Sequence, residues 1–154
     1  MPRKTPIDLV RAIVPRGIPH AGALGCELVS VEKGRAVVRL PWREEFVGNP
    51  ETRAPSGGVI TTLIDTAAGM AAMAALDEMV PIATLDLRIE YLKPAAEGRT
   101  IEAAAECHKV TRTIAFVRAW AYQDGRDDPV ATASGTFMLD SSDAVLRPPP
   151  KKRP

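Results

Sequence analysis

Hydrophobic and polar residues alternate along much of the chain, and this period-two pattern predicts strands. The sequence IATLDLRIEYL, residues 82–92, places Ala83, Leu85, Leu87, Ile89 and Tyr91 on one face and Thr84, Asp86, Arg88 and Glu90 on the other. Such alternation is typical of a strand that is buried on one face. The same period predicts strands over residues 99–110, 113–122 and 129–139, the last after an Asp124-Gly125 turn, and two more within residues 25–42 on either side of a Lys33-Gly34 turn.

A different pattern occupies residues 59–76, which are apolar or small at almost every position. The run is too long for one strand and predicts a helix that is buried on nearly every side. It follows a loop, residues 44–58, that is rich in Gly, Pro and Asn. Asp65 is the only charged residue in the run. Because an Asp at the centre of a membrane span costs about 2.5 to 3.5 kcal/mol, the pattern favours a helix buried in protein over one in a membrane.

The predicted order of elements is strand, strand, long helix and then four strands. The connections between the last four strands are too short for crossover helices, so the sheet is expected to be antiparallel. The predicted fold class is therefore α+β, with five to six strands in a curved sheet around one long central helix. Because that helix is apolar on nearly every face, we expect a second subunit to complete its cover.

Composition narrows the class of protein. The chain has 154 residues, of which 45% are hydrophobic and 25% charged, and this predicts a single domain over residues 1–140. Aromatic residues make up only 5%, so the abundant alanines are expected to bring backbones close together. Residues 141–154, which end in RPPPKKRP, predict a disordered tail. The formal charge is +1, and without the four basic residues of RPPPKKRP it is −3, which argues against a nucleic-acid-binding domain.

The cysteines and histidines show no metal-binding pattern. Cys26 and Cys107 are far apart, without metal-ligand spacing, and are predicted to be buried free thiols in a reducing compartment. His20 and His108 have no ligand partners at a useful spacing. The first ten residues lack an apolar run of signal-peptide length. We therefore expect a cytoplasmic protein with no metal site and no membrane association.

The sequence SGG, residues 56–58, stands at the start of the predicted helix and indicates where chemistry could take place. Backbone N–H groups in the first turn of a helix have no partner within the helix, and Gly57 and Gly58 leave theirs unshielded at the positive end of the helix dipole. Such groups stabilise the oxyanion that forms when a carbonyl is attacked. Asp65 would supply a general base or the nucleophile itself. The alternative is structural: Asp65 hydrogen-bonds a strand backbone or pairs with an arginine.

The spacing between these groups predicts an oligomer. Asp65 follows the glycine pair by seven to eight residues, which is roughly 10 to 12 Å along a helix. Groups that far apart cannot act on one carbonyl carbon. The glycines of one subunit are therefore expected to work with Asp65 of another, so that function requires a homodimer with two equivalent sites.

Three stretches, APSGGVITTLIDTAAGMAA, ATLDLRIEYLKPA and TRTIAFVRAWAY, resemble the hotdog-fold acyl-CoA thioesterases of the phenylacetate-pathway (PaaI-like) family. That family has an Asn in the loop, then a His-Gly-Gly, then an acidic residue nine positions after the His, and a strand that ends in a Pro-Ala turn. In this chain Asn49 lies in the loop, the glycine pair is present, Asp65 stands nine residues after Ser56, and Pro94-Ala95 closes the strand. The departure is Ser56, which stands where the family usually has His.

The resemblance implies the hotdog fold and the hydrolysis of an aryl- or medium-chain acyl-CoA to a free acid and coenzyme A. It implies no cofactor apart from the coenzyme A of the substrate, and a homodimer that assembles further into a homotetramer. The catalytic residues that it implies are Asp65, Gly57, Gly58, Asn49 and Thr84, and the substrate-binding residues are Ser56, Arg112 and Arg88. Thr84 would position the attacking water, and Arg112 would lie near the phosphates of coenzyme A. A plain interface threonine and an exposed arginine without a ligand are the alternatives.

Other chemistries fit the sequence less well. Ser56 is expected to cap the helix and not to act as a nucleophile, because APSGG lacks the first glycine of a nucleophile elbow and has no histidine near it. Hydratases and dehydratases of the same fold use a His with an acidic residue, and no His lies in the predicted helix or in the loop before it. The alternative function is a hotdog module that binds acyl-CoA without hydrolysing it, which the loss of the motif His favours.

Overall fold

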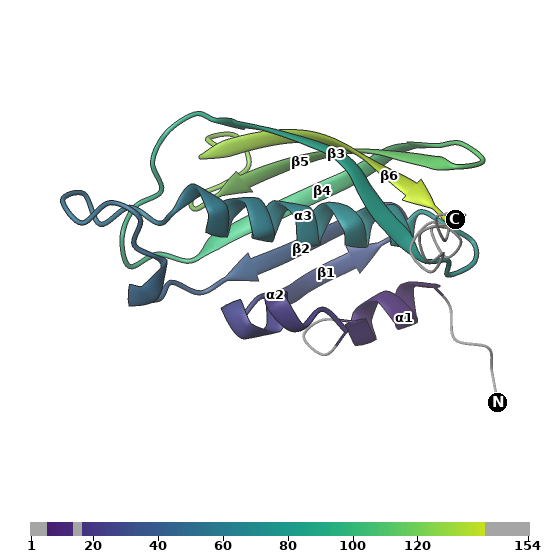
Figure 1. The fold of residues 1–154 in the computed structure, drawn as a ribbon, viewed down its shortest axis with the longest axis horizontal. Coiled ribbons are helices and arrows are strands. Elements are labelled where there is room, and N and C mark those ends of the chain that lie inside the picture. Colours follow the sequence, from purple (N-terminus) through teal and green to yellow (C-terminus); the bar gives the residue numbers. More distant parts are fainter. Residues whose placement is uncertain (1–5, 14–16, 141–154) are drawn as a thin grey trace, which may run out of the picture.

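The computed structural model describes residues 6–13 and 17–140, and in it one long helix lies against a curved antiparallel sheet (Figure 1). The strands are β1 (Glu27–Glu32), β2 (Arg35–Leu40), β3 (Ile82–Tyr91), β4 (Ile101–Val110), β5 (Ile114–Tyr122) and β6 (Ala131–Leu139). The helices are α1 (Pro6–Ile13), α2 (Pro19–Leu24) and α3 (Gly57–Ala74), with a 3-10 turn η1 (Glu44–Phe46). The predicted α+β class and the order of strands around the long helix are confirmed, and the predicted tail, residues 141–154, lies outside the described residues.

The strand order in the sheet is β1-β2-β4-β5-β6-β3. Every neighbouring pair is antiparallel, as the short connections predicted. The chain leaves β2 near one edge and returns in β3 at the opposite edge, and α3 makes this crossing over one face of the sheet (Figure 1). Strand β3 therefore has one edge that pairs with β6 and one edge that pairs with no strand of the described chain.

Small side chains bring α3 close to the sheet. The helix packs mainly on β2, β4 and β5. The inward-facing residues of β4 and β5 are largely alanines, and none of the following is more than 2% exposed: Ala103, Ala105, Ala115, Ala119 and Ala121. The facing helix surface carries alanines as well, among them Ala67, Ala71 and Ala72, which have no exposed surface. A core built in this way reaches interior packing density through short interaxial distances and needs few aromatic rings.

The two N-terminal helices give α3 part of its remaining cover. Period-two alternation did not predict α1 and α2, yet both pack against α3, and Val10 and Ala21 within them are fully buried. A second subunit was expected to complete the cover of this helix, and these two helices supply part of that cover from the same chain. The boundaries of α2 were readable from the sequence, because Pro19 begins it and Gly25, at φ 80°, follows its end.

The length and composition of α3 alone would allow it to cross a membrane. In the fold, however, 61% of this helix is buried inside the protein. Lys33 closes its far end by donating to the carbonyl oxygen of Leu76 over 3.2 Å and pairing with Asp77 over 2.6 Å. The helix is thus held by the chain's own sheet, N-terminal helices and turns.

A β-bulge in β3 changes the predicted faces of that strand. The pairing register of β3 with β6 shifts between Thr84 and Asp86, so the strand has one extra residue at Leu85. One extra residue reverses the alternation of faces. Leu87 packs against the core as predicted, but Leu85 is 53% exposed. The single predicted alternation over residues 82–92 was therefore wrong at this end of the strand, where Thr84 turns toward α3.

Both cysteines are free thiols, but their environments differ. Cys26 is 2% exposed, and burial raises the pKa of its thiol to about 11. Cys107 is only half-buried, near a register shift at the end of β4, so the prediction of two buried thiols was wrong for this residue. Burial raises the pKa of the Cys107 thiol as well.

Candidate active site

The first part of the candidate site joins α3 to the start of β3. The hydroxyl of Thr84 donates a hydrogen bond of 2.9 Å to Oδ1 of Asp65, and the bulge at Leu85 is what turns Thr84 toward the helix. The structural alternatives for Asp65 were an arginine partner and a strand backbone. Within the described residues, no basic side chain pairs with Asp65 and its one hydrogen bond is to a side chain. Its second oxygen therefore remains available.

Asp65 and Thr84 line a cavity of about 570 Å³. The rest of the lining is mainly apolar and comes from the segment before α2, from α3, from the residues before and at the start of β3, and from β6: Gly17, Ile18, Thr66, Gly69, Met70, Met73, Met79, Val80, Pro81, Ile82 and Phe137. Three of these side chains are methionines, whose unbranched thioethers adapt to ligands of different shape. A carboxylate beside an apolar cavity suits a molecule whose reacting group is polar and whose remainder is apolar.

The second part of the site is the start of α3. Ser56 is the N-cap, and its hydroxyl oxygen accepts from the N–H of Gly58 over 3.3 Å, so the predicted capping bond is present. For the N–H of Gly57 the described part of the chain provides no acceptor. This N–H lies at the positive end of an 18-residue helix. Of the two glycines, Gly57 thus has the N–H that is open to a ligand oxygen.

Two side-chain hydroxyl groups contact the carbonyl oxygen of Gly57. The hydroxyl of Tyr91 donates to the carbonyl oxygen of Gly57 over 2.7 Å and lies 2.7 Å from Oγ1 of Thr61. Thr61 also donates to the Gly57 carbonyl, over 3.0 Å. No role was predicted for Tyr91, because alternation placed it among the apolar positions of its strand. Its partner lies 34 residues away, and no local pattern signals a contact of that range.

The two parts of the site are well separated within one chain. Because α3 runs without interruption from Gly57 to Ala74, Asp65 lies about 12 Å along the axis from Gly57. One carbonyl group cannot contact the N–H of Gly57 and the carboxylate of Asp65 over that distance. A single chain therefore presents two half-sites on one helix.

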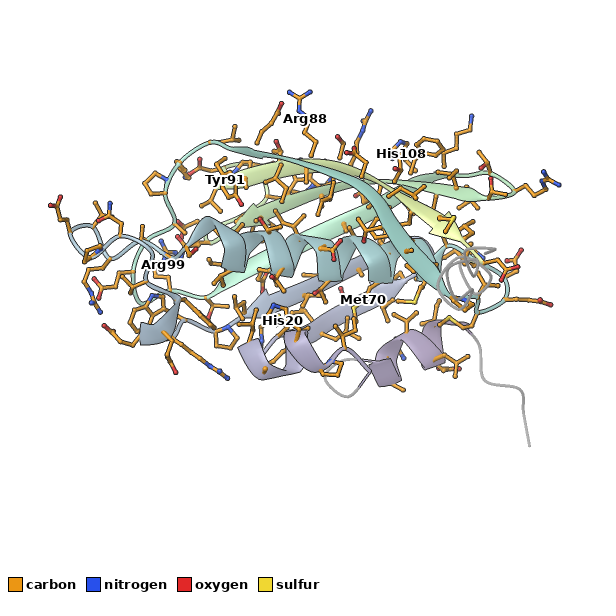
Figure 2. The ribbon with its side chains drawn as sticks, viewed as in Figure 1. His20, Met70, Arg88, Tyr91, Arg99 and His108 are labelled. Carbon is orange, nitrogen blue, oxygen red and sulfur yellow. The ribbon has the colours of Figure 1, made fainter. Side chains whose placement is uncertain are left out.

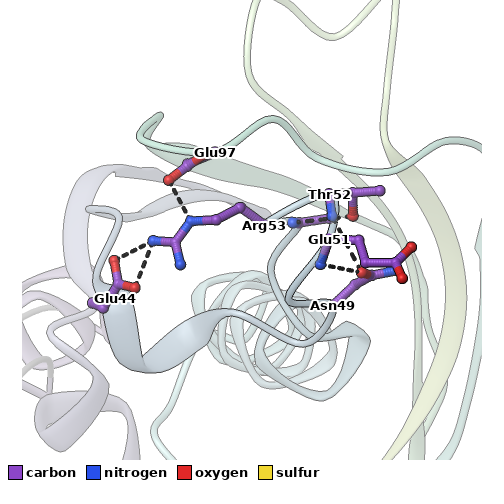
Figure 3. A network of polar contacts seen from close by, with 7 residues as sticks. Glu44, Asn49, Glu51, Thr52, Arg53 and Glu97 are labelled. Carbon is purple, nitrogen blue, oxygen red and sulfur yellow. Dashed lines mark hydrogen bonds and ion pairs between the residues drawn. The ribbon is translucent and has the colours of Figure 1, made fainter.

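Asn49 occupies a tight loop whose conformation is fixed locally (Figure 3). Its side-chain oxygen accepts from the backbone N–H groups of Glu51, over 2.9 Å, and Thr52, over 3.2 Å. This arrangement is an Asx turn, which explains an Asn here without reference to a substrate. In the described residues, Asn49 makes no side-chain hydrogen bond to Asp65 or to the glycine pair, so one chain does not bring them together.

Arg53 anchors the same loop to its surroundings. It adopts a left-handed backbone with φ 58° and pairs with Glu44 over 2.5 Å and with Glu97 over 2.7 Å (Figure 3). The hydrogen bonds that Arg53 donates to these two carboxylates raise the pKa of its guanidinium. The loop before α3 is thus tied both to η1 and to the connection that precedes β4.

The two arginines predicted to contact substrate lie away from Asp65. Arg88 points outward from the sheet on the side opposite α3 (Figure 2) and pairs with Glu90 over 2.7 Å. Arg112 is exposed in the turn between β4 and β5. Neither guanidinium forms a hydrogen bond or ion pair with Asp65 in the described chain.

His20 lies beside α3, which its position in the sequence did not suggest. Its Nε2 is 3.5 Å from Oγ1 of Thr62, a residue one turn before Asp65 (Figure 2). The short helix α2 brings it there. A histidine therefore lies near the helix after all, although it comes from the N-terminal segment and not from the loop before α3.

Several known proteins have sequences similar to this chain. The sequence profile of the thioesterase superfamily matches residues 56–130. A candidate esterase of Halobacterium salinarum is 31% identical over 88% of this chain and 96% of its own length. A second one, from Saccharolobus solfataricus, is 33% identical over 60% of this chain, and the match spans 64% of its length. The medium/long-chain acyl-CoA thioesterase YigI of Escherichia coli is 27% identical over 86% of this chain and 93% of its own.

Solved structures show the same fold. A crystal structure from Pseudomonas aeruginosa has 34% sequence identity and a TM-score of 0.77, and it covers 86% of this chain and 98% of the other. A mutant of the phenylacetic acid degradation protein PaaI from Thermus thermophilus has 27% identity and a TM-score of 0.69, over 78% of this chain and 97% of its own. These similarities extend over most of the described chain, including both halves of the candidate site.

Proposed function

The chain belongs to the thioesterase superfamily and has its hotdog fold, and from that premise we propose that it hydrolyses acyl-CoA thioesters to a free acid and coenzyme A. The observation that carries the proposal is the carboxylate of Asp65 at the wall of an apolar cavity, oriented by Thr84. The relatives that bear an acyl-CoA thioesterase name support the substrate class.

In the proposed reaction, Asp65 takes a proton from water while the water oxygen bonds to the thioester carbonyl carbon. The carbonyl oxygen becomes an oxyanion, which accepts a hydrogen bond from the N–H of Gly57. The tetrahedral intermediate then collapses, the carbon–sulfur bond breaks and coenzyme A leaves as a thiolate that takes up the proton. In the alternative, Asp65 attacks the carbonyl carbon directly and water hydrolyses the resulting anhydride.

We propose that each site is built from two copies of the chain. Strand β3 is an edge strand of ten residues, and Leu85 and Tyr91 within it are 53% and 50% exposed. A long edge with exposed apolar side chains favours pairing with another strand. Such pairing between two β3 strands, related by a two-fold axis, is antiparallel.

Antiparallel pairing through β3 would also complete the site. Near its start β3 contacts Asp65 through Thr84, and at its end it contacts Gly57 through Tyr91. The second β3 runs in the opposite direction, so its Tyr91 end lies beside the Thr84 end of the first. Gly57 of the second copy is thereby brought toward Asp65 of the first, which resolves the separation of about 12 Å along one helix.

The cavity supports a medium-chain or aryl acyl group as the part of the substrate that it holds. Its volume of about 570 Å³ lies within the range of about 300 to 1,000 Å³ that is usual for small-molecule sites. The methionines in its wall favour tolerance of several chain shapes over strict selection of one.

The test is hydrolysis of a panel of aryl and straight-chain acyl-CoAs, read by release of free thiol. Asp65→Asn keeps the shape of the side chain and removes the base, so kcat should fall by at least about 100-fold. Asp77→Asn is the matched control, because Asp77 lies beyond the far end of the same helix and is exposed, and its activity should equal that of the wild type.

Two outcomes would contradict the proposal. Wild-type turnover in a folded Asp65→Asn variant would exclude Asp65 as the essential carboxylate. Saturable binding of acyl-CoAs by the wild type, without thiol release from any of them, would assign the chain as a binding module. The replacement of the family's His by Ser56 is the feature that favours this second function.

A further inference from the structure

The first turn of α3 contains two adjacent glycines, which make its backbone flexible. Gly57 and Gly58 leave the backbone bare, which an oxyanion needs for close approach, but glycine has more backbone freedom than any other residue. The first turn of a helix is also the place where helices fray, since its N–H groups have no partner inside the helix. A donor that must be in place before the reaction therefore needs support from outside the first turn.

Tyr91 and Thr61 supply such support at one atom. Both hydroxyl groups lie within hydrogen-bond distance of the Gly57 carbonyl oxygen, at 2.7 Å and 3.0 Å, and they lie 2.7 Å from each other. Thr61 comes from the second turn of α3, and Tyr91 comes from the end of β3. The first residue of the helix is thus tied to its own next turn and to the edge strand of the sheet.

The packing around Gly57 shows that the tyrosine ring lies directly against it. A Cβ atom at residue 57 would stand 3.2 Å from both Cζ and the hydroxyl oxygen of Tyr91. At residue 58 the nearest atom would be the Ser56 hydroxyl oxygen, at 3.7 Å. A side chain at residue 57 would therefore push against the tyrosine ring, whereas residue 58 has room for one.

Packing alone does not account for a tyrosine at this position. The side chain is 50% exposed, and a phenylalanine would cover Gly57 with the same ring. What the hydroxyl adds is the bond to the Gly57 carbonyl and the contact with Thr61. From this geometry we propose that Tyr91 is a positioning residue, which acts with Thr61 to hold the first turn of α3 so that the Gly57 N–H is aimed at the substrate oxyanion.

This inference rests on the proposed thioesterase function, and it makes β3 the element that sets both halves of the site. Thr84 orients the carboxylate of Asp65, and Tyr91 orients the N–H donor of Gly57. Both side chains project from one strand. A shift of β3 would therefore move the base and the oxyanion donor together.

The test compares variants that differ by one hydroxyl group. Tyr91→Phe and Thr61→Val remove the two hydroxyls and keep the side-chain shapes, while Thr61→Ser keeps the hydroxyl and serves as the conservative rescue. Tyr122→Phe is the matched control, since Tyr122 is the only other tyrosine and lies in β5, hydrogen-bonded to Glu102.

Tyr91→Phe and Thr61→Val should each lower kcat by about 10- to 100-fold, because small misplacements of a reacting group have effects of that size. The KM should stay within about twofold, since ground-state binding of the acyl group does not involve the oxyanion. Thr61→Ser should recover most of the kcat that Thr61→Val loses, and Tyr122→Phe should have wild-type kcat. The double variant should be little worse than either single one, because the two hydroxyls act on one carbonyl.

A second readout does not depend on turnover. Hydrogen exchange at the amides of residues 58–60, which are bonded to Ser56, should be faster in Tyr91→Phe than in the wild type, while exchange in the middle of α3 is unchanged. Unchanged exchange there, or wild-type kcat in both Tyr91→Phe and Thr61→Val, would overturn the positioning role while leaving the proposed function intact. A wild-type protein that hydrolyses no acyl-CoA would contradict the proposed function, and the exchange measurement would still decide whether Tyr91 holds the turn.

Discussion

The capping bond of Ser56 determines which backbone N–H at the start of α3 is left without an acceptor. The Ser56 hydroxyl oxygen accepts from the N–H of Gly58, so that this group is satisfied and the N–H of Gly57 remains. A serine hydroxyl is shorter than an imidazole and does not titrate near neutral pH. The residue that stands where the family has histidine therefore bonds the backbone next to it, and in the proposed mechanism the start of the helix stabilises the oxyanion.

Ser56→Ala should cost mainly stability. Loss of the capping bond is expected to lower the free energy of unfolding by about 0.5 to 2 kcal/mol, measured by chemical denaturation, while at least about a tenth of the activity remains. Ser56→Asn is the control, because Asn caps a helix as well as Ser does. A serine-directed fluorophosphonate should fail to label the protein. Stoichiometric labelling at Ser56, or no turnover in a folded Ser56→Ala variant, would show that Ser56 is a nucleophile.

Among the elements, β3 has the largest influence on the site, through its bulge. The extra residue at Leu85 turns Thr84 toward α3 while Leu87 and Ile89 continue to face the core. On the neighbouring strand, Gly135 is paired with Leu87, directly after the bulge. A Cβ at residue 135 would lie 3.0 Å from the carbonyl oxygen of Asp86, so a glycine avoids a close contact with the backbone of β3 beside the bulge.

Gly135→Ala should therefore destabilise the protein and disturb the site. The added methyl group must displace the Asp86 backbone, and overpacking of this kind costs about 1 to 3 kcal/mol. We expect a lower melting temperature in calorimetry and a lower kcat, because Thr84 moves with the bulge. Gly125→Ala is the control, since a Cβ there would meet nothing within 4 Å. Equal melting temperatures for the two variants would show that the bulge tolerates a side chain at residue 135.

At the scale of the whole protein, the length of α3 between Gly57 and Asp65 separates the two groups that the proposed reaction needs, an N–H donor and a carboxylate. The helix is unbroken between Gly57 and Asp65, so the proposed mechanism requires that the oxyanion donor and the base come from two copies of the chain. The open edge of β3, with its exposed apolar side chains, provides a surface for that combination.

Subunit mixing tests this arrangement. Asp65→Asn and Gly57→Ala are each expected to be inactive, the second because its methyl group meets the Tyr91 ring. In a mixed dimer, one of the two sites has both groups intact. Random exchange of equal amounts should then restore about a quarter of the wild-type activity, since half of the dimers are mixed.

Subunit exchange itself must be verified, for example by fluorescence transfer between labelled copies. Each variant incubated alone under the same conditions is the control and should stay inactive. If the subunits exchange and no activity returns, the site does not draw its two halves from different copies.

Local patterns in the chain were enough to predict most of the elements and the chemical groups that they carry. Alternation over residues 82–92, the apolar run around Asp65 and the glycine pair are patterns of this kind, and they suffice because backbone period and helix-end chemistry act over a few residues. The resemblance of three stretches to acyl-CoA thioesterases agreed with the fold that these elements form. The helix start was placed within two residues of Gly57 for the same reason.

How these groups meet was visible only once the chain was folded. The bulge that turns Thr84 toward Asp65 depends on the pairing of β3 with β6, about 50 residues later, and the contact of Tyr91 with Gly57 spans 34 residues. The packing of α2, which brings His20 to Thr62, likewise depends on the surrounding fold. The face on which a side chain lies and the residues that it contacts depend on which distant segments pack together. A one-residue change of register moves a strand's side chains to the opposite face of the sheet.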